Sequence, residues 1–408
     1  MKIRFEKSKV NRFFVLIGFI LTFYSSACLW NENNLSNYIM CSAVVVFLSL
    51  VIFLTQPISI NKIINNKYVL WVILTYVIFE AYGFLRLKAG QFNWDFILVS
   101  GVLQISLTIM LMTLKDNNEV INTYCIASLV SIVIVCINMV LKGSIRLSNI
   151  RLGSSFGLEL SGNRNTVATI IGILLIPVSY MVLKYKKYRI VLIPISVFAA
   201  GCMLLTGSKK GIIVLMLIML MVFIADKGSV KYLLFPFIVI LGVYAVFNVP
   251  VLYKVIGFRL KDMFATLGIG TAVTSAQSTY IRNSYIKMGL KSMWKHPLFG
   301  GGMNYFQYIN SARYYSHNNY VELLNNFGIV GTLIYYLPAT KKIPILHKSI
   351  KSKRQTDEYS TVVFLLMFLI SKFALDYAMV SYSTMCVFNI QFLLIIEVLR
   401  RERISNAS

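Results

Sequence analysis

The chain has 408 residues, of which 57% are hydrophobic and only 13% are charged. Soluble domains are about 45–50% apolar and about 25% charged, so a soluble globular enzyme and a disordered binding protein are both excluded. The 40 Lys and Arg residues outnumber the 15 Asp and Glu residues, which gives a formal charge of +25. This composition predicts an all-α polytopic membrane protein, with one integral membrane domain over residues 1–408.

Apolar segments occur along the whole chain, and a spanning helix needs about 20 such residues. We expect about twelve transmembrane helices, at 13–30, 36–54, 68–85, 95–114, 120–141, 165–183, 190–206, 211–225, 232–253, 319–339, 359–379 and 381–399. The first segment is expected to be a retained helix, because it lacks a small-residue cleavage site and further spans follow it.

Lysine and arginine in short loops predict the orientation of these helices. They cluster before the first span, in alternate loops, in the loop 341–358 and after the last span. We therefore expect a bacterial cytoplasmic membrane protein with both termini cytoplasmic. One outer connection, between the ninth and tenth spans at 254–318, is far longer than ordinary connections. Its aromatic content indicates a folded, functional extracytoplasmic loop.

The outer segments are strongly basic, which is unusual for that side of a membrane. Glu159 and Asp262 are the acids there, against the cations Lys142, Arg146, Arg151, Arg164, Lys209, Lys210, Lys254, Arg259, Lys261, Arg282, Lys287, Lys291, Lys295 and Arg313. A basic outer surface indicates an anionic partner. Nucleic acid is implausible outside a membrane, so we expect a lipid diphosphate or anionic lipid headgroups.

Arg282 is the strongest anion-binding candidate in the long loop. Residues 278–295 predict a helix lying along the membrane, with Lys287, Lys291 and Lys295 on one solvated stripe. Arg282 falls on the more apolar side, where a guanidinium needs an anionic partner. We interpret Arg282 as functional rather than as part of a structural salt bridge.

A second candidate anion site is Ser208-Lys209-Lys210, at the start of the eighth span. Ser208 is expected to cap that helix, and both lysines then lie in its first turn. Free backbone N–H groups and two cations form a good anion site. A simple outer turn with snorkelling lysines explains the pattern equally well.

His317 lies at the outer mouth of the tenth span, and Glu322 lies about one turn into it. Histidine is the usual proton acceptor near neutral pH, and an intramembrane carboxylate is a functional candidate by default. We expect Asn318 or Asn319 to cap this span. His296 and His347 are interpreted as structural and incidental, respectively.

Other polar residues in the spans have simpler interpretations. Lys372 and Asp376 are four residues apart and are expected to neutralise each other on one helix face. The six cysteines all fall in apolar runs without metal-binding spacing, so neither a zinc site nor a disulfide framework is predicted. No cofactor is expected.

Four motifs, in this order, resemble the O-antigen polymerase and O-antigen ligase superfamily, which includes Wzy-type polysaccharide polymerases. Asn163 to Asn165 opens the sixth span, and Gly207-Ser208-Lys209 matches a Ser-Arg pair that opens a span. Arg282 followed by His296-Pro297-Leu298-Phe299-Gly300-Gly301-Gly302 resembles the loop motif. His317-Asn318 followed by Gly328-Ile329-Val330-Gly331 resembles the His-Asn block. The resemblance covers mainly residues 145–340.

Two positions depart from the family pattern. Lys209 replaces an arginine and loses the bidentate fork that binds phosphate. Asn326 stands where many members have an acid.

The resemblance implies a membrane glycosyltransferase with a lipid-linked donor and undecaprenyl diphosphate as leaving group. It would act in capsule, exopolysaccharide or O-antigen synthesis, with its active site outside. The resemblance and the chemistry assign Arg282 to the diphosphate, with Ser208, Lys209 and Lys210 as further contacts. His317 is the expected base, with Glu322 expected to orient it, and Arg151, Asn165 and Arg259 are secondary candidates. Without an Asp-x-Asp motif, metal-independent transfer is expected.

Three alternatives remain open. A ligase that moves the finished glycan to another acceptor would use the same residues. The Ile-, Asn- and Lys-rich composition is typical of AT-rich genomes, common in Gram-positive capsule producers, and favours a polymerase, with a chain-length regulator as a possible partner. A lipid-linked oligosaccharide flippase is less favoured, because polar residues gather at one face and no repeat is visible. A structural scaffold explains neither Arg282 nor His317.

Overall fold

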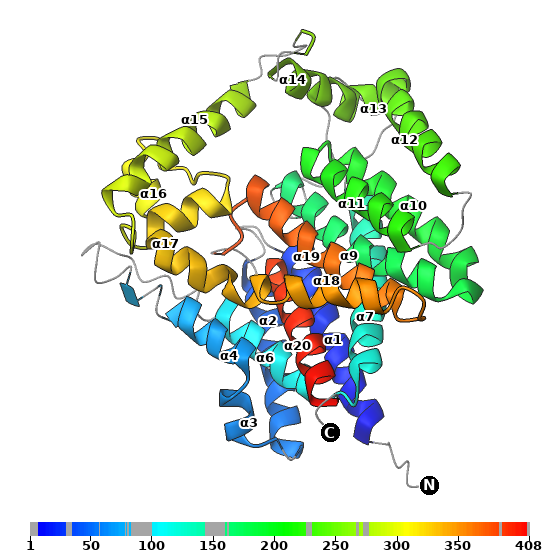
Figure 1. Cartoon of the computed structure of the whole chain (residues 1–408), viewed down its shortest axis with the longest axis vertical. Coiled ribbons are helices and arrows are strands. Elements are labelled where there is room, and N and C mark those ends of the chain that lie inside the picture. Colours follow the sequence, from blue (N-terminus) through cyan, green and yellow to red (C-terminus); the bar gives the residue numbers. More distant parts are fainter. Residues whose placement is uncertain are drawn as a thin grey trace.

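The computed structural model describes residues 7–29, 35–56, 58–77, 79, 81–82, 100–142, 160, 163–225, 231–266, 269–271, 277–382 and 386–405. Within these ranges the chain is helical and contains no strand (Figure 1). Several of the helices are long and apolar enough to cross a membrane. The prediction of an all-α membrane protein is therefore confirmed.

The described helices occur in the following order along the chain. The first half of the described chain contains α1 (Lys7–Cys28), α2 (Leu35–Thr55), α3 (Ile60–Ile64), α4 (Lys67–Val72), α6 (Leu103–Met112), α7 (Asn117–Lys142), α9 (Arg164–Lys184), α10 (Arg189–Leu205) and α11 (Lys209–Ala225). The second half contains α12 (Lys231–Asn248), α13 (Pro250–Leu252), α14 (Phe258–Thr266), α15 (Gln277–Ser292), α16 (Tyr305–Ile309), α17 (Asn319–Thr340), α18 (Ile343–Ser352), α19 (Tyr359–Ala378) and α20 (Ile390–Ser405).

Among the described residues, six helices are by themselves long and apolar enough to span a membrane. They lie at Ser8–Cys28, Ser36–Thr55, Asn117–Lys142, Arg164–Lys184, Lys186–Leu205 and Tyr359–Ala378. The bent pair Ile240–Asn248 and Pro250–Asp262 makes a seventh if it is one span. Shorter apolar helices at Lys67–Tyr76 and Ser100–Met112 coincide with predicted spans. The twelve-span topology stays a prediction.

The predicted ninth span does not run unbroken to residue 253. Its helix ends at Asn248, and the chain turns by 78° into a second helical stretch that begins at Pro250. Proline lacks a backbone N–H and disfavours helical geometry in the residue before it, and Val249 is extended at φ −81° and ψ 117°. The predicted loop 254–318 contains the helices α14, α15 and α16.

The last predicted span begins later than expected. Residue 381 does not start a helix, and α20 begins at Ile390. The backbone N–H groups of Ser381 and Tyr382 instead donate to the side-chain oxygen of Asn319 in α17, at 2.9 and 3.0 Å. These bonds hold the segment before α20 against α17, a tertiary contact that hydropathy does not encode.

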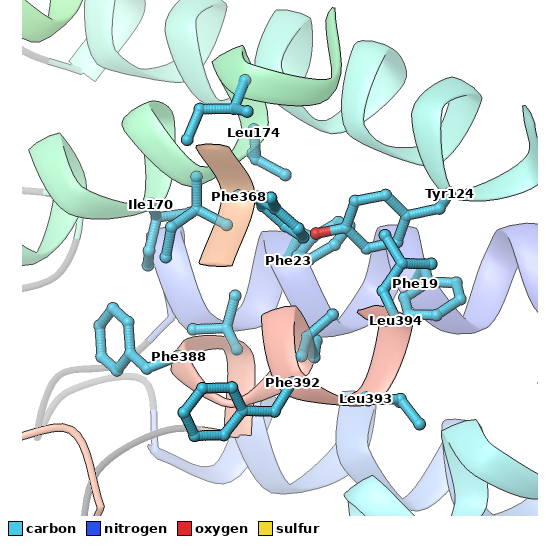
Figure 2. Close-up of a cluster of buried hydrophobic side chains, with 14 of the residues drawn as sticks. Phe19, Phe23, Tyr124, Ile170, Leu174, Phe368, Phe388, Phe392, Leu393 and Leu394 are labelled. Carbon is cyan, nitrogen blue, oxygen red and sulfur yellow. The ribbon is translucent and has the colours of Figure 1, made fainter. Parts of the chain in front are cut away.

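The core lies where α1, α7, α9 and α19 meet, and Figure 2 shows its aromatic centre. The ring of Tyr124 packs edge-on against Phe19 at 5.4 Å, Phe23 at 5.8 Å and Phe368 at 5.7 Å between centroids. Lipid gives helices no hydrophobic drive to associate, so close packing of this kind supplies much of the attraction.

The segment between α11 and α17 forms an arch over one side of the bundle. In Figure 1 the helices α12, α13, α14 and α15 run along the upper edge, and α16 and α17 return the chain to the bundle. The arch brings α14 and α15 into the same region as the first turn of α11 and the first turn of α17.

Candidate active site

Helix α17 is interrupted at Gly328, and this break determines how the neighbouring segment packs against the helix. Gly328 has φ 64° and ψ −165°, a conformation that is rare for other residues. A Cβ at this position would lie 2.4 Å from the carbonyl carbon of Leu298. The glycine of the His-Asn block therefore permits close approach of another segment.

The segment that approaches is the glycine-rich loop motif, 296–302. The carbonyls of Asn325 and Asn326 accept hydrogen bonds from Gly301 and Gly302, at 2.9 and 2.8 Å. Beyond the break, the N–H groups of residues 329 and 330 donate to the carbonyls of residues 297 and 298, at 2.9 and 3.0 Å. Two of the family motifs thus form a backbone interlock that satisfies the broken helix. His296, whose ring packs against Tyr305 at 5.5 Å, belongs to this interlock, as its structural interpretation anticipated.

Two asparagines of α17 attach the arch to the bundle. The side chain of Asn326 accepts from the N–H of Phe306 at 3.0 Å and donates to the hydroxyl of Tyr382 at 2.7 Å. Asn325 donates to the carbonyl of Gly289 in α15 at 3.0 Å. A Cβ on Gly289 would lie 2.2 Å from Val321, so α15 can approach α17 this closely only at a glycine. This contact fixes the helix that carries Arg282.

A network of hydrogen bonds holds the turn that contains His317. Asn318 caps α17 by accepting from the N–H of Val321 at 3.0 Å, as predicted. The carboxylate of Glu322, which is buried, accepts from the N–H of Ser316 at 2.7 Å. Glu322 was expected to orient the imidazole of His317. The hydrogen bond that the structure shows is instead with the backbone beside His317. The carboxylate acts on the turn instead.

His317 itself adopts a left-handed backbone conformation, with φ 59°. Such conformations in residues other than glycine are costly and gather at functional sites. Its half-buried imidazole lies against the ring of Tyr315, with 4.3 Å between centroids. Burial, together with the charges of Arg282 and Lys210, lowers the pKa of His317 to about 4. The imidazole is neutral at pH 7 and can accept a proton.

Five cations from four helices lie within electrostatic range of one another, and two of them, Arg282 and Lys210, act on His317. We call them the cation cluster: Arg164, Lys209, Lys210, Arg259 and Arg282. Arg282 acts electrostatically on Arg164, Lys209 and Lys210, and Arg259 is within range of Arg164 and Lys209. Burial lowers the pKa of Arg282, while the hydroxyl of Tyr315 favours its charged form. Among the described residues, Asp262 is the acid that acts on the cluster, through Lys209. The cluster therefore concentrates positive charge beside His317.

Ser208 has an unexpected environment at the start of α11. It immediately precedes Lys209, as predicted for a cap. Its hydroxyl, however, makes no capping hydrogen bond: it is buried and has no partner among the described residues. A buried hydroxyl normally has a partner, so this one is suited to a ligand. The predicted N-cap bond is therefore wrong, whereas the position beside the cluster agrees with an anion contact.

Arg259 has a structural task in addition to its charge. Its guanidinium donates to the carbonyl of Gly207 at 2.5 Å, and so ties α14 to the turn between α10 and α11. This bond keeps Lys209 and Lys210 near the arch. The secondary candidate Asn165 lies in the first turn of α9, where its N–H bonds the cap residue Asn163 at 2.9 Å. The remaining secondary candidate, Arg151, lies outside the described residues.

Two residues of the site were missed by reasoning from sequence. Arg164 was counted as a basic outer residue but not as a candidate, although it is the first residue of α9 and neighbours Asn165. Tyr315 is one of several aromatic residues of the long loop, and its contact with His317 depends on the turn at residues 316–318. Of these two residues, only Arg164 could have been selected from the sequence, because it lies within the Asn163 to Asn165 motif.

A second group of charged residues lies in the bundle and has a different character. Lys372 donates to Asp376 at 2.5 Å and to Ser381 at 2.8 Å, and both charged side chains are buried. Asp376 also accepts from the hydroxyl of Tyr336 at 2.8 Å. The predicted mutual neutralisation is confirmed. We call Lys372, Asp376, Ser381, Tyr336 and Asn319 the buried polar network.

No group of three or more His, Cys, Asp or Glu side chains suited to a metal ion occurs within the described residues. Metal-independent chemistry stays a prediction. The cations and one neutral histidine are suited to bind a polyanion and to remove a proton from a nearby hydroxyl.

Residues 194–336 match the family model described as O-antigen ligase. This match supports the resemblance of the chain to the O-antigen polymerase and ligase superfamily. The matched segment contains the loop motif, the His-Asn block, four members of the cation cluster and Glu322, and it excludes Arg164 and the pair Lys372 and Asp376. The comparison with curated proteins gave no match.

Proposed function

We propose that this protein is a polysaccharide polymerase that joins undecaprenyl-diphosphate-linked oligosaccharide repeat units at the outer face of the cytoplasmic membrane. The observation that carries the proposal is the convergence of the cation cluster on a neutral histidine. A lipid diphosphate is the polyanion that a membrane glycosyltransferase of this superfamily would be expected to hold there. The reaction needs both a stabilised leaving group and a base, and the site offers both.

In the proposed reaction, the hydroxyl oxygen of the acceptor sugar forms a bond to the anomeric carbon of the donor glycan. The bond from that carbon to the diphosphate oxygen breaks, and its electron pair stays on the diphosphate. His317 accepts the hydroxyl proton. Arg282, assisted by Lys210, Lys209 and the hydroxyl of Ser208, stabilises the charge that develops on the leaving diphosphate. Glu322 holds the backbone turn that carries His317.

The donor glycan would be transferred onto the incoming repeat unit, so both substrates carry a lipid diphosphate. Their negative charge offsets the repulsion that Arg282 and Lys210 exert on a protonated His317. Substrate binding is therefore expected to raise the basicity of this histidine toward that of an ordinary imidazole. Binding of the donor would therefore make His317 a stronger base.

A ligase is the second candidate, and the description of the matched family favours it. Polymerase and ligase differ in the acceptor and share the donor site. Purified protein in vesicles, supplied only with lipid-linked repeat units, separates them. A polymerase yields a ladder of lipid-linked products, whereas a ligase yields none until a different acceptor is added.

The same assay tests the proposed function as a whole. Product formation is expected to persist in EDTA, because protein cations stabilise the diphosphate. It should fall strongly in Arg282→Ala and remain near wild type in Lys287→Ala, which removes an exposed cation from the same helix. Strict dependence on a divalent ion, or equal losses in the two variants, would contradict the assignment. If no glycan is transferred to any acceptor but labelled lipid crosses the bilayer, the protein is a flippase.

A further inference from the structure

A cavity lies at the opposite end of α17 from the cation cluster. It has a volume of about 640 Å³ and opens between the start of α4 and the final turns of α17 and α20. The indole N–H of Trp71 in α4 donates to the carbonyls of Ile334 and Tyr335, both at 3.1 Å. These bonds hold α4 beside α17 and give the cavity a fixed wall.

The cavity has a graded polarity along its depth. Lys67 begins α4, and Lys341 directly follows the last residue of α17, so both lysines lie at the same rim. The lining residues Leu74 and Ile334 each lie seven positions from the lysine of their own helix. At about 1.5 Å per residue, the apolar walls extend about 10 Å below the charged rim.

The charge of the rim is not cancelled by the residues that line it. Among the described residues, Lys67, Lys341, Lys342 and Arg400 line the cavity, and no acidic side chain does. Arg400 is already paired with Glu397, at 2.7 Å, so we assign the attraction for an anion to Lys67 and Lys341. Lys67 and Lys341 are exposed and can reach a headgroup.

A cationic rim above apolar walls matches one kind of molecule, an anionic phospholipid. Its phosphate would meet the lysines while an acyl chain lies along the walls. A free phosphate has no group that would fill the apolar part, and a neutral lipid carries no net negative charge for the lysines to attract. We propose that this cavity binds one anionic phospholipid, of the leaflet on the side of the loop 341–358. The site is separate from the proposed transferase chemistry.

The experiment measures lipid binding to the full-length protein by native mass spectrometry after detergent purification. Dioleoylphosphatidylglycerol is expected to remain bound in preference to dioleoylphosphatidylcholine. The variant Lys67→Gln with Lys341→Gln should lose this preference by about 5-fold for each lysine removed, the effect of one cation near a lipid surface. Glycerol phosphate, which has the headgroup chemistry without the tails, should not displace the lipid.

A matched control removes the same charge elsewhere. Lys62→Gln with Lys115→Gln replaces two exposed lysines that do not line the cavity and should keep the preference. Equal retention of the two lipids by the wild-type protein overturns the proposal, whatever the variants do. Displacement by glycerol phosphate, or an equal loss in the control variant, also overturns it.

Discussion

The cation cluster and the buried polar network use the same kinds of side chains in opposite ways. In the network, Lys372 donates to its counter-ion Asp376 at 2.5 Å, and the hydroxyl of Tyr336 donates a hydrogen bond to the same carboxylate. In the cluster, Arg282 and Lys210 have no acidic partner among the described residues, and the buried hydroxyl of Ser208 has no hydrogen-bond partner there. A charge that is paired within the protein supports the fold, whereas cations such as Arg282 and Lys210 are suited to bind an anionic ligand.

The two regions are joined through the first turn of α17. Asn318, which caps the helix, donates to the carbonyl of Tyr377 at 3.0 Å, and Asn319 donates to Asp376 at 3.4 Å. His317 directly precedes these residues. The satisfied network therefore anchors the turn on which the proposed base is carried. Four predictions separate the anchoring role from the chemical one.

The largest expected effect is the loss of the proposed base. His317→Ala should lower glycan transfer by about 10²–10⁴-fold, because an acceptor proton must leave in the transition state. Donor binding should stay near wild type, since the proton moves only during the reaction. Transfer is measured in vesicles with lipid-linked repeat units. His347→Ala, which removes an exposed histidine of α18, is the matched control and should transfer normally.

Transfer by His317→Ala at a near wild-type rate would remove His317 from the mechanism. Loss of folding in this variant, seen as loss of the monodisperse elution peak, would assign the residue to structure instead.

The next effect concerns the buried polar network and falls on stability. Asp376→Ala leaves Lys372 buried without a counter-ion and should destabilise the protein by about 3–5 kcal/mol. The double variant Lys372→Met with Asp376→Leu removes both charges and should recover most of that loss. Thermal unfolding in detergent checks both variants. If the double variant is no more stable than the single one, mutual neutralisation is not the reason for the pair.

A smaller, graded effect is expected at Arg282. Arg282→Ala should weaken donor binding as well as turnover, because the guanidinium meets the diphosphate before and during the reaction. Arg282→Lys should recover only part of the loss, since a point charge lacks the bidentate fork. Neither variant should lower the unfolding temperature as Asp376→Ala does. Full recovery by lysine would show that charge alone matters at this position.

The smallest effect is a displacement of the pH profile. The lowered pKa of about 4 keeps His317 neutral in the free enzyme, so kcat/KM should fall only well below pH 6.5. Removing a neighbouring cation favours the protonated imidazole and raises its pKa. Lys210→Met should therefore move the acidic limb of kcat/KM to higher pH. A limb that stays in place, or moves lower, would mean that Lys210 does not act on the titrating group.

The same lowered pKa predicts a trend in stability. The unfolded chain binds the proton near pH 6.5 and the folded chain near pH 4, so this residue makes the fold less stable as the pH falls between these values. His317→Ala should weaken that dependence.

The sequence by itself determined the class of the molecule and most of its chemistry. Hydropathy and charge led to a helical membrane protein, and the order of four motifs led to the resemblance to the O-antigen polymerase and ligase superfamily that the family model supports. They also selected Arg282, Lys209, Lys210 and His317, because cations and a histidine in apolar surroundings have few structural explanations. The pairing of Lys372 with Asp376 followed from their spacing on one helix face.

Only the tertiary structure decided which of these residues meet and what each contacts. Glu322 accepts from the backbone of Ser316, Arg164 joins the cluster from α9, and Asn319 accepts from the backbone of residues 381 and 382. Each of these contacts joins segments whose proximity depends on the path of the backbone, through the bend at Pro250 and the break at Gly328. Hydropathy and charge are summed along the chain, whereas a hydrogen bond depends on distance and direction in space.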